Sequence, residues 1–277
     1  MSSSHQAYGI DPHARGPAGA GIRERMAILI QTGKRSWLKA LRRPVPLAFS
    51  FVQPLWWMLI FGFLFHRYDL GPEYFRIPYL TFVLPGVCVM TVLFGASQAG
   101  IDLVRDLQTG FAQRMAASTR HPGWVLGGKL AADVARLLAQ AVVVGLLGRM
   151  LGARLWIDWS AVLAAGVGLA LFAVAYGSLS CWIALRTRAP ESMAVFVHVL
   201  NLPLLFTSTA LVPARQMPGW LAAAAAWNPV TLVADALRQG LLFGRMGDIG
   251  RMLPPLLVLA VLLFALARHG MARAAEE

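Results

Sequence analysis

Charged residues are scarce in this chain. Asp, Glu, Lys and Arg make up only 14% of its 277 residues, whereas 57% are hydrophobic. Soluble domains carry about 25% charged residues, so this composition does not supply a fully water-facing surface. It excludes an ordinary soluble domain and indicates an all-α integral membrane protein, which at this length forms one helical bundle.

Cysteine and catalytic motifs are also lacking. The two cysteines, Cys88 and Cys181, lie inside apolar runs, and their spacing suits neither a disulfide framework nor a metal site. The six histidines are scattered, and no H-E-x-x-H, C-x-x-C or G-x-S-x-G motif occurs. We therefore expect no catalytic residue, metal or cofactor in this chain.

The stretch Gly123–Leu130, GWVLGGKL, comes close to a nucleotide-binding loop. It fits G-x-x-x-x-G-K, but Leu130 stands where a Walker A motif has the Ser or Thr that binds Mg²⁺. A helix-like segment and Pro122 precede it, whereas a P-loop follows a strand, and an apolar run comes next. We therefore reject ATP binding here, and expect the glycines to form a flexible step with Lys129 at the inner headgroups.

The first 43 residues contain no long apolar run. Residues 1–21 are rich in Ser, Gly, Pro and Ala without periodicity, which predicts a disordered tail. Residues 22–43 place apolar side chains at helical spacing and basic residues elsewhere. This pattern favours an amphipathic helix in the membrane interface over a soluble helix packed on its own domain, because an apolar run follows at once.

Residues 44–277 contain six apolar segments that suit membrane-spanning helices of about 20 residues. The third segment is the weakest, because charges interrupt it. Arg136 and Arg149 would have to reach opposite headgroup layers, and Asp133 would pair with Arg136 on one helix face. The predicted spans are residues 46–65, 77–101, 130–151, 159–185, 192–214 and 252–267.

Residues 216–243 need a separate interpretation. The stretch Gln216–Ala234 is long enough to span, but it is rich in Ala, and Pro218-Gly219 and Asn228-Pro229 interrupt it. We interpret the segment as a re-entrant or interfacial helical hairpin, with Trp220 and Trp227 at the level of the headgroups. A seventh span is the alternative.

The net charge of +12 agrees with a membrane topology. With six spans and the N-terminus inside, basic residues favour the inner side by about two to one, as the positive-inside rule requires. A seventh span leaves a similar balance, so the rule does not decide between the two. No nucleic-acid-binding motif is present, and we expect membrane lipid rather than nucleic acid beside these charges.

Two polar segments carry more specific patterns. In Leu211–Gly244, a proline follows a long span, and a Met-Pro-Gly-Trp run, an Asn-Pro pair and an Asp-Ala-Leu-Arg run come after it. In the loop 102–129, Asp106, Gly110 and Arg114 form an acidic-x-x-x-Gly-x-x-x-Arg pattern, and Gly128-Lys129 opens the third span. From about Pro44 onward, the chain thereby resembles the ABC-2 type transporter permeases, in particular their daunorubicin-resistance, drug-exporter branch. It departs from them at Thr119, where that family often has a proline; here the proline is Pro122.

The resemblance implies a half-transporter with six spans, an amphipathic N-terminal helix, a cytoplasmic coupling helix within 102–129 and extracellular re-entrant helices before the last span. Two permease subunits, identical or different, would pair, and two separate ATPase subunits that bind ATP and Mg²⁺ would dock beneath them. The expected location is the bacterial plasma membrane, with both termini in the cytoplasm. From its residues alone, the loop 102–129 suits a docking element and a simple solvated connection equally well.

The resemblance also suggests roles for particular residues. Those expected to couple to the ATPase are Asp106, Gly110, Phe111, Arg114 and Pro122. Those expected to form an outer gate are Pro218, Trp220, Asn228, Pro229, Asp235 and Arg238.

Polar and aromatic residues within the spans suggest a substrate path. His198 and Asn201 lie three apart in an apolar segment, so they would share a helix face. They would line the path or the subunit interface, or else be satisfied by neighbouring helices. Trp56 and Trp57 would meet a flat lipophilic substrate or face lipid.

The expected function is export of a lipophilic drug or lipid-like compound. A polysaccharide or teichoic-acid exporter of the same superfamily is the first alternative. A membrane enzyme or scaffold without a transport role is the second.

Overall fold

The computed structural model describes residues 26, 30–34, 44–110, 122–155, 158–244 and 246–276, and every regular element within them is a helix. The all-α class is therefore confirmed for this part of the chain. The elements are α2 (Pro44–Leu64), η1 (Pro72–Tyr74), α3 (Tyr79–Gln108), α5 (Pro122–Met150), α6 (Trp159–Thr187), α7 (Pro190–Phe206), η2 (Ala214–Gln216), α8 (Gly219–Ala226), α9 (Pro229–Phe243) and α10 (Met246–Glu276).

Four of the described helices, α3, α5, α6 and α10, are long and apolar enough to cross a membrane. They correspond to the second, third, fourth and sixth predicted spans. The first and fifth predicted spans fall on α2 and α7. Among the described side chains, their apolar stretches are Phe51–Leu64 and Pro190–Phe206, which are shorter.

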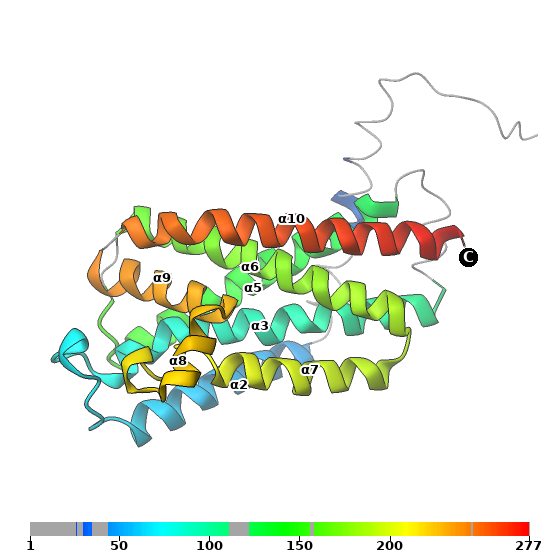
Figure 1. The fold of residues 1–277 in the computed structure, drawn as a ribbon. Coiled ribbons are helices and arrows are strands. Elements are labelled where there is room, and N and C mark those ends of the chain that lie inside the picture. The colour runs from blue at the N-terminus through cyan, green and yellow to red at the C-terminus, as the bar shows by residue number, and fades with distance from the viewer. Residues whose placement is uncertain are drawn as a thin grey trace, which may run out of the picture.

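The long helices run side by side in one bundle (Figure 1). α3 is its central element and packs against α2, α5, α6, α7 and α9, whereas α10 packs mainly on α6. At one end, called the hairpin end here, lie η1, α8, α9 and residues 151–155, which follow α5 (Figure 1). At the opposite, C-terminal end lie the last turns of α3, α6 and α10 (Figure 1).

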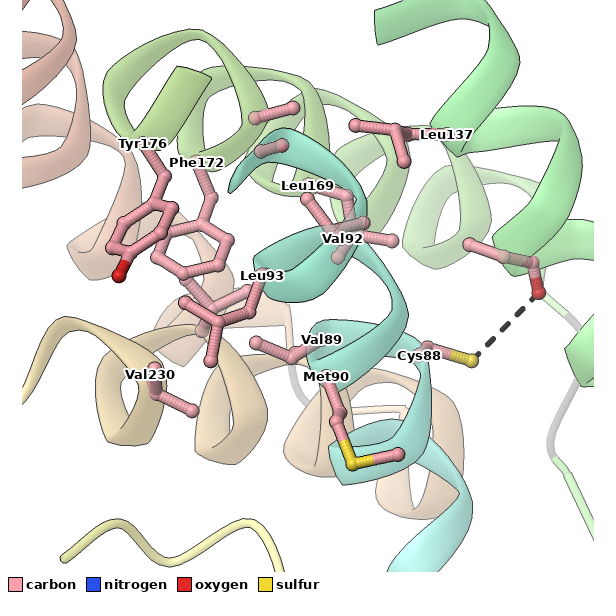
Figure 2. Packing of buried hydrophobic residues seen from close by; sticks show 14 of the residues in the cluster. Cys88, Val89, Met90, Val92, Leu93, Leu137, Leu169, Phe172, Tyr176 and Val230 are labelled. Atoms are coloured by element: carbon pink, nitrogen blue, oxygen red, sulfur yellow. Dashed lines mark hydrogen bonds between the residues drawn. The ribbon is translucent and has the colours of Figure 1, made fainter. Parts of the chain in front are cut away.

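The core is built around the face of α3 between Val89 and Leu93 (Figure 2). Leu137 of α5 and Leu169 and Phe172 of α6 pack near this face, and Val230 of α9 approaches it from the hairpin side (Figure 2). The Cys88 thiol lies in the same region and donates to the carbonyl of Ala141 at 3.7 Å. Cys88 and Cys181 are both buried and free, which agrees with their expected role as small apolar residues.

Polar residues and glycines set the helix ends. Asp158 caps α6 by accepting from the amide of Ser160 at 3.3 Å. Gly110 and Gly244 follow α3 and α9 with φ of 67° and 66°, a left-handed conformation that glycine adopts without steric cost. Gly110 of the Asp106-Gly110-Arg114 pattern therefore has a structural role, because its left-handed conformation lets the chain turn away at the end of α3.

The predicted fifth span, 192–214, is wrong at its end. α7 stops at Phe206, and residues 207–213 are not helical. The amide and the hydroxyl of Thr207 both donate to the carbonyl of Pro203, at 2.9 and 2.7 Å, and close the last turn. The sequence has no glycine or charged residue just after Phe206 to indicate the end of the helix. A prediction from hydropathy alone therefore extended the span beyond the helix.

The predicted flexible step in GWVLGGKL is also wrong. Pro122 opens α5, and the stretch forms the first turns of that helix, eight residues before the predicted start of the span. Proline suits this position, because the first helical amide has no partner within the helix. Lys129 is buried in α5 and lies 3.3 Å from Asp133, which also lies 3.8 Å from Arg136, so the predicted Asp133–Arg136 pair is confirmed.

The tail 1–21 and most of the predicted amphipathic helix 22–43 lie outside the described residues. The described piece 30–34 is helical, with Thr32 buried and Lys34 exposed. A methyl group built at Gly33 would lie 3.3 Å from the carbonyl oxygen of Gly128. This piece therefore packs against α5 where the two glycines allow close approach.

Candidate functional site

The hairpin end is organised by the break after α7. Residues 207–213 lack the regular hydrogen bonds of a helix, and an unsatisfied backbone group away from water costs several kcal/mol. Other elements provide partners for them. Tyr79 of α3 donates to the carbonyl of Leu211 at 2.8 Å, and the hydroxyl of Thr231 on α9 accepts from the amide of Thr209 at 3.1 Å.

Arg238 of α9 is the central side chain of this end. It is fully buried, and its Nη2 donates to the carbonyls of Thr209 and Ala210 at 3.0 and 3.4 Å. Its Nε donates to the carbonyl of Phe82 at 3.2 Å, and its guanidinium lies 3.9 Å from the centre of the Phe82 ring. One side chain of α9 thereby binds both α3 and the broken end of α7.

Asp235 neutralises this buried charge. Its Oδ1 accepts from Nη1 of Arg238 at 2.6 Å and from the hydroxyl of Thr209 at 2.7 Å. The Asp235 side chain is 44% exposed, so the pair joins a buried cation to a partly solvated anion. A buried charge costs much less when it is paired and hydrogen-bonded in this way.

Asn228 fixes the turn of the α8–α9 hairpin. Its side-chain oxygen accepts from the amide of Val230 at 2.8 Å and caps α9, with Pro229 at the first helical position. Its side-chain amide donates to the carbonyl of Leu204 at 2.7 Å and to the hydroxyl of Thr207 at 3.0 Å. The predicted helical hairpin is thus present, and Asn228 attaches it to the last turn of α7.

Three of the residues predicted for an outer gate therefore meet around the end of α7: Asn228, Asp235 and Arg238. Pro218 instead precedes α8 as its N-cap. Trp220 and Trp227 are 73% and 91% exposed, so both stand on the surface of the hairpin. The structure thus separates the predicted gate residues into an anchored cluster and an exposed aromatic rim.

A second set of contacts ties the α2–α3 connection to the same end. Gln216 donates to the carbonyl of Asp69 at 2.6 Å, and Arg215 lies 3.6 Å from Glu73. A methyl group built at Gly86 of α3 would lie only 2.2 Å from the carbonyl oxygen of Ala210. The break after α7 therefore rests directly on the backbone of α3, which sequence inspection did not find.

Asn201 belongs to a buried polar network in the middle of the bundle. Its side-chain oxygen accepts from the hydroxyl of Tyr176 at 2.5 Å, and its side-chain amide donates to the hydroxyl of Ser97 at 2.8 Å. Ser180 donates to the carbonyl of Ser97 at 2.7 Å and accepts from the amide of Gly100 at 3.1 Å. Neighbouring helices therefore satisfy Asn201, as the alternative interpretation expected.

His198 points away from this network. It is exposed on α7, whereas Asn201 is fully buried, so the two side chains do not form the common surface that their spacing suggested. Trp56 is also exposed, at 63%. Trp57 instead stacks on Phe61, with ring centres 5.1 Å apart, and meets the edge of Phe206 at 6.2 Å.

α2 and α7 both pack on α3, and they lie along the same side of the bundle (Figure 1). Each of the three helices exposes a polar side chain within its apolar sequence: Gln53, Gln98 and His198. Sequence inspection missed the two glutamines, although an amide within an apolar run is the signal that would have found them. We call the exposed residues of α2, α3 and α7, including these three, the α2–α7 face.

Of the predicted ATPase-coupling residues, those that the structure describes lie at the C-terminal end (Figure 1). Asp106 is partly buried in the last turns of α3, Gly110 ends that helix, and Pro122 begins α5. Phe111 and Arg114 lie outside the described residues. α3 continues to Gln108 and α5 begins at Pro122, so both ends of the predicted segment 102–129 are helical, and residues 111–121 lie outside the described residues.

Most of the chain is similar to known transport proteins. The family described as ABC-2 type transporter matches residues 29–242. A "Putative transport permease ycf38" of Cyanophora paradoxa is 30% identical over 206 residues, which cover 74% of this chain and 71% of that protein. The "Daunorubicin resistance ABC transporter permease protein DrrB1" of Streptomyces coeruleorubidus is 30% identical over 214 residues, or 76% of this chain and 74% of that one. A "Probable doxorubicin resistance ABC transporter permease protein DrrC" of Mycobacterium tuberculosis is 25% identical over 165 residues, 56% of each chain.

Proposed function

Because this chain belongs to the ABC-2 type transporter family, we propose that it is the permease subunit of an ATP-binding cassette exporter for a lipophilic drug or lipid-like compound. The observation that carries this proposal is the family match across residues 29–242, which covers the whole bundle up to α9. The similarity to permeases named for daunorubicin and doxorubicin resistance favours a lipophilic substrate over a polysaccharide.

The bundle supports six membrane crossings. α3, α5, α6 and α10 have the length and composition of spans. α2 and α7 run alongside them (Figure 1). Side chains of α9 and of its N-cap donate hydrogen bonds to backbone carbonyls at the break after α7, and such bonds permit irregular backbone at membrane depth. In this topology the α8–α9 hairpin lies at the outer surface of the bacterial plasma membrane, and both termini are cytoplasmic.

The permease contains no complete Walker A motif, so a separate subunit hydrolyses ATP. Two such ATPases dock at the C-terminal end, against the segment between α3 and α5 and residues Asp106, Gly110, Phe111, Arg114 and Pro122. α3 starts at the hairpin end and ends just before this segment, and with 30 residues it is roughly 45 Å long. Movement of the segment is thereby transmitted to Arg238 and Asp235 through one central, mostly buried helix.

Two permease subunits form the transport path. The α2–α7 face faces the second subunit, because its exposed amides and His198 need polar surroundings within the membrane. Trp56 and the exposed residues around it meet the lipophilic substrate. Asn201 supports α7 from behind and does not touch substrate.

Export of a lipophilic fluorescent dye from cells that express the permease with its ATPase tests the proposal. Arg114→Ala and Asp106→Ala should abolish export, while the permease keeps its amount in the membrane and its unfolding temperature. Arg67→Ala, an exposed position at the hairpin end, is the matched control and should export normally. Normal export by both coupling variants would contradict the assignment of the loop, and failure of the wild type to bind any ATPase would contradict the proposed function.

A further inference from the structure

The C-terminal halves of α6 and α10 pack closely together. A methyl group built at Gly270 would lie 3.3 Å from Cδ1 of Leu185 and 3.8 Å from Cδ1 of Trp182. Both helices run toward the C-terminal end (Figure 1), and they pack against each other.

Each of the two helices has an apolar strip in this half. On α10, Leu262 and Leu266 are 58% and 50% exposed and lie one turn apart. On α6, Leu179 and Trp182 are partly exposed and also lie on one face.

An arginine ends each apolar strip. Arg186 follows Trp182 by one turn, and its guanidinium lies 5.7 Å from the centre of the Trp182 ring. Arg273 follows Leu266 by seven residues and is exposed. We call the surface made by Leu179, Trp182, Arg186, Leu262, Leu266 and Arg273 the α6–α10 seam.

Among the described side chains, no Asp or Glu of α6 or α10 lies on the seam. α6 contains no Asp or Glu, and α10 has none between Asp248 and Glu276. Among the described side chains, neither Arg186 nor Arg273 lies in an ion pair. Two cations at the end of an apolar strip match a molecule with an anionic head and hydrocarbon chains.

We propose that the α6–α10 seam binds an anionic phospholipid of the surrounding bilayer. Its phosphate lies between Arg186 and Arg273, because a planar guanidinium donates two parallel hydrogen bonds to phosphate oxygens. Its acyl chains lie along Leu266, Leu262 and Leu179, and Trp182 occupies the boundary between headgroup and hydrocarbon. The site requires only that α6 and α10 span a bilayer. An experiment can therefore contradict lipid binding at the seam without contradicting export, and the reverse.

The test measures which lipids the purified full-length chain retains. The protein is placed in mixed micelles that contain equal amounts of phosphatidylglycerol and phosphatidylcholine, and the bound lipids are counted by native mass spectrometry. A basic residue near an anionic lipid surface contributes roughly a fivefold preference, so two of them give about 25-fold enrichment of phosphatidylglycerol. We expect this enrichment in the wild type.

Arg186→Gln with Arg273→Gln should reduce the enrichment to near unity, and Arg186→Lys with Arg273→Lys should retain most of it. The matched control is Arg268→Gln, because Arg268 lies on the other side of α10, against Gly123 of α5. It should keep the wild-type enrichment. If the double Gln variant fails to fold, the two single Gln variants replace it, each with an expected loss of about fivefold.

Unchanged enrichment in the Gln variants would overturn the proposal. Equal loss in Arg268→Gln would also overturn it, since the preference would then come from the general positive charge of this end.

Discussion

Arg238 and Phe82 are 156 residues apart in the chain, yet they meet twice. The Arg238 Nε donates to the Phe82 carbonyl at 3.2 Å, and the guanidinium lies 3.9 Å from the centre of the Phe82 ring. Through Thr209 and Ala210, the same guanidinium holds the end of α7. The Arg238 side chain therefore connects the α8–α9 hairpin, the central helix α3 and the break after α7.

Replacing Arg238 should destabilise the protein strongly. Arg238→Ala leaves the carbonyls of Phe82, Thr209 and Ala210 without this donor, and we expect a loss of about 3–5 kcal/mol in the free energy of unfolding. Unfolding in detergent, followed by circular dichroism, measures it. Arg215→Ala removes an exposed ion pair with Glu73 and should cost at most about 1 kcal/mol; equal losses would show that Arg238 is not an anchor.

The close contact of α3 with the break predicts a position-specific effect of a single methyl group. Gly86→Ala places Cβ 2.2 Å from the carbonyl oxygen of Ala210, so the segment must shift and the unfolding temperature should fall. Gly145→Ala and Gly166→Ala are matched controls in α5 and α6, because a Cβ there meets nothing within 4 Å. They should be neutral or stabilising by up to about 1 kcal/mol, because alanine favours a helix over glycine. A Gly86→Ala protein as stable as these controls would show that the contact is loose.

Asn201 and His198 should differ in what they affect. Asn201→Leu leaves the hydroxyls of Tyr176 and Ser97 without their partner in the core, and we expect about 1–3 kcal/mol of destabilisation. His198→Ala, at an exposed position three residues away, should change stability by no more than about 0.5 kcal/mol. It should instead lower dye export, since we place it on the α2–α7 face. If His198→Ala lowers the free energy of unfolding as much as Asn201→Leu does, the assignment of His198 to an exposed face is wrong.

The topology can be tested by labelling single cysteines with a membrane-impermeant maleimide. Cys88 and Cys181 are buried, so Cys88→Ala with Cys181→Ala gives a background without native thiols. In intact cells, Arg67→Cys at the hairpin end should react, whereas Gln108→Cys at the end of α3 should react only after the cells are opened. Both positions are exposed. The reverse pattern would invert the proposed orientation, and reaction of both in intact cells would contradict a span between them.

The hairpin shows which structural features local sequence is able to predict. Asn228-Pro229 was predicted to interrupt the segment, and α9 begins there, because the Asn side chain caps the first free amide and proline suits the next position. The interruption at Pro218 likewise lies just before α8. Both interruptions were predicted correctly, because each depends on groups within three residues of one another.

The break after α7 is a feature that local sequence did not predict. From residue 192 to 214 the chain is uncharged and apolar, which is why a single span was predicted. The helix stops at Phe206 because Arg238, Asn228 and Tyr79, all remote in sequence, supply the hydrogen bonds that the chain gives up. GWVLGGKL failed in the opposite direction: its glycines suggested a flexible step, but contact with Gly33 and Arg268 gives them a place within α5.

The sequence by itself determined the membrane class, the positions of the apolar helices, the hairpin and the resemblance to ABC-2 type permeases, since composition, hydropathy and capping act over short distances along the chain. Tertiary structure alone decided that Arg238 is an internal anchor, that Asn201 is satisfied while His198 is exposed, and that Arg186 and Arg273 end a shared apolar surface. The physical reason is common to all three: whether a polar side chain is buried, paired or exposed depends on which other helices pack against it.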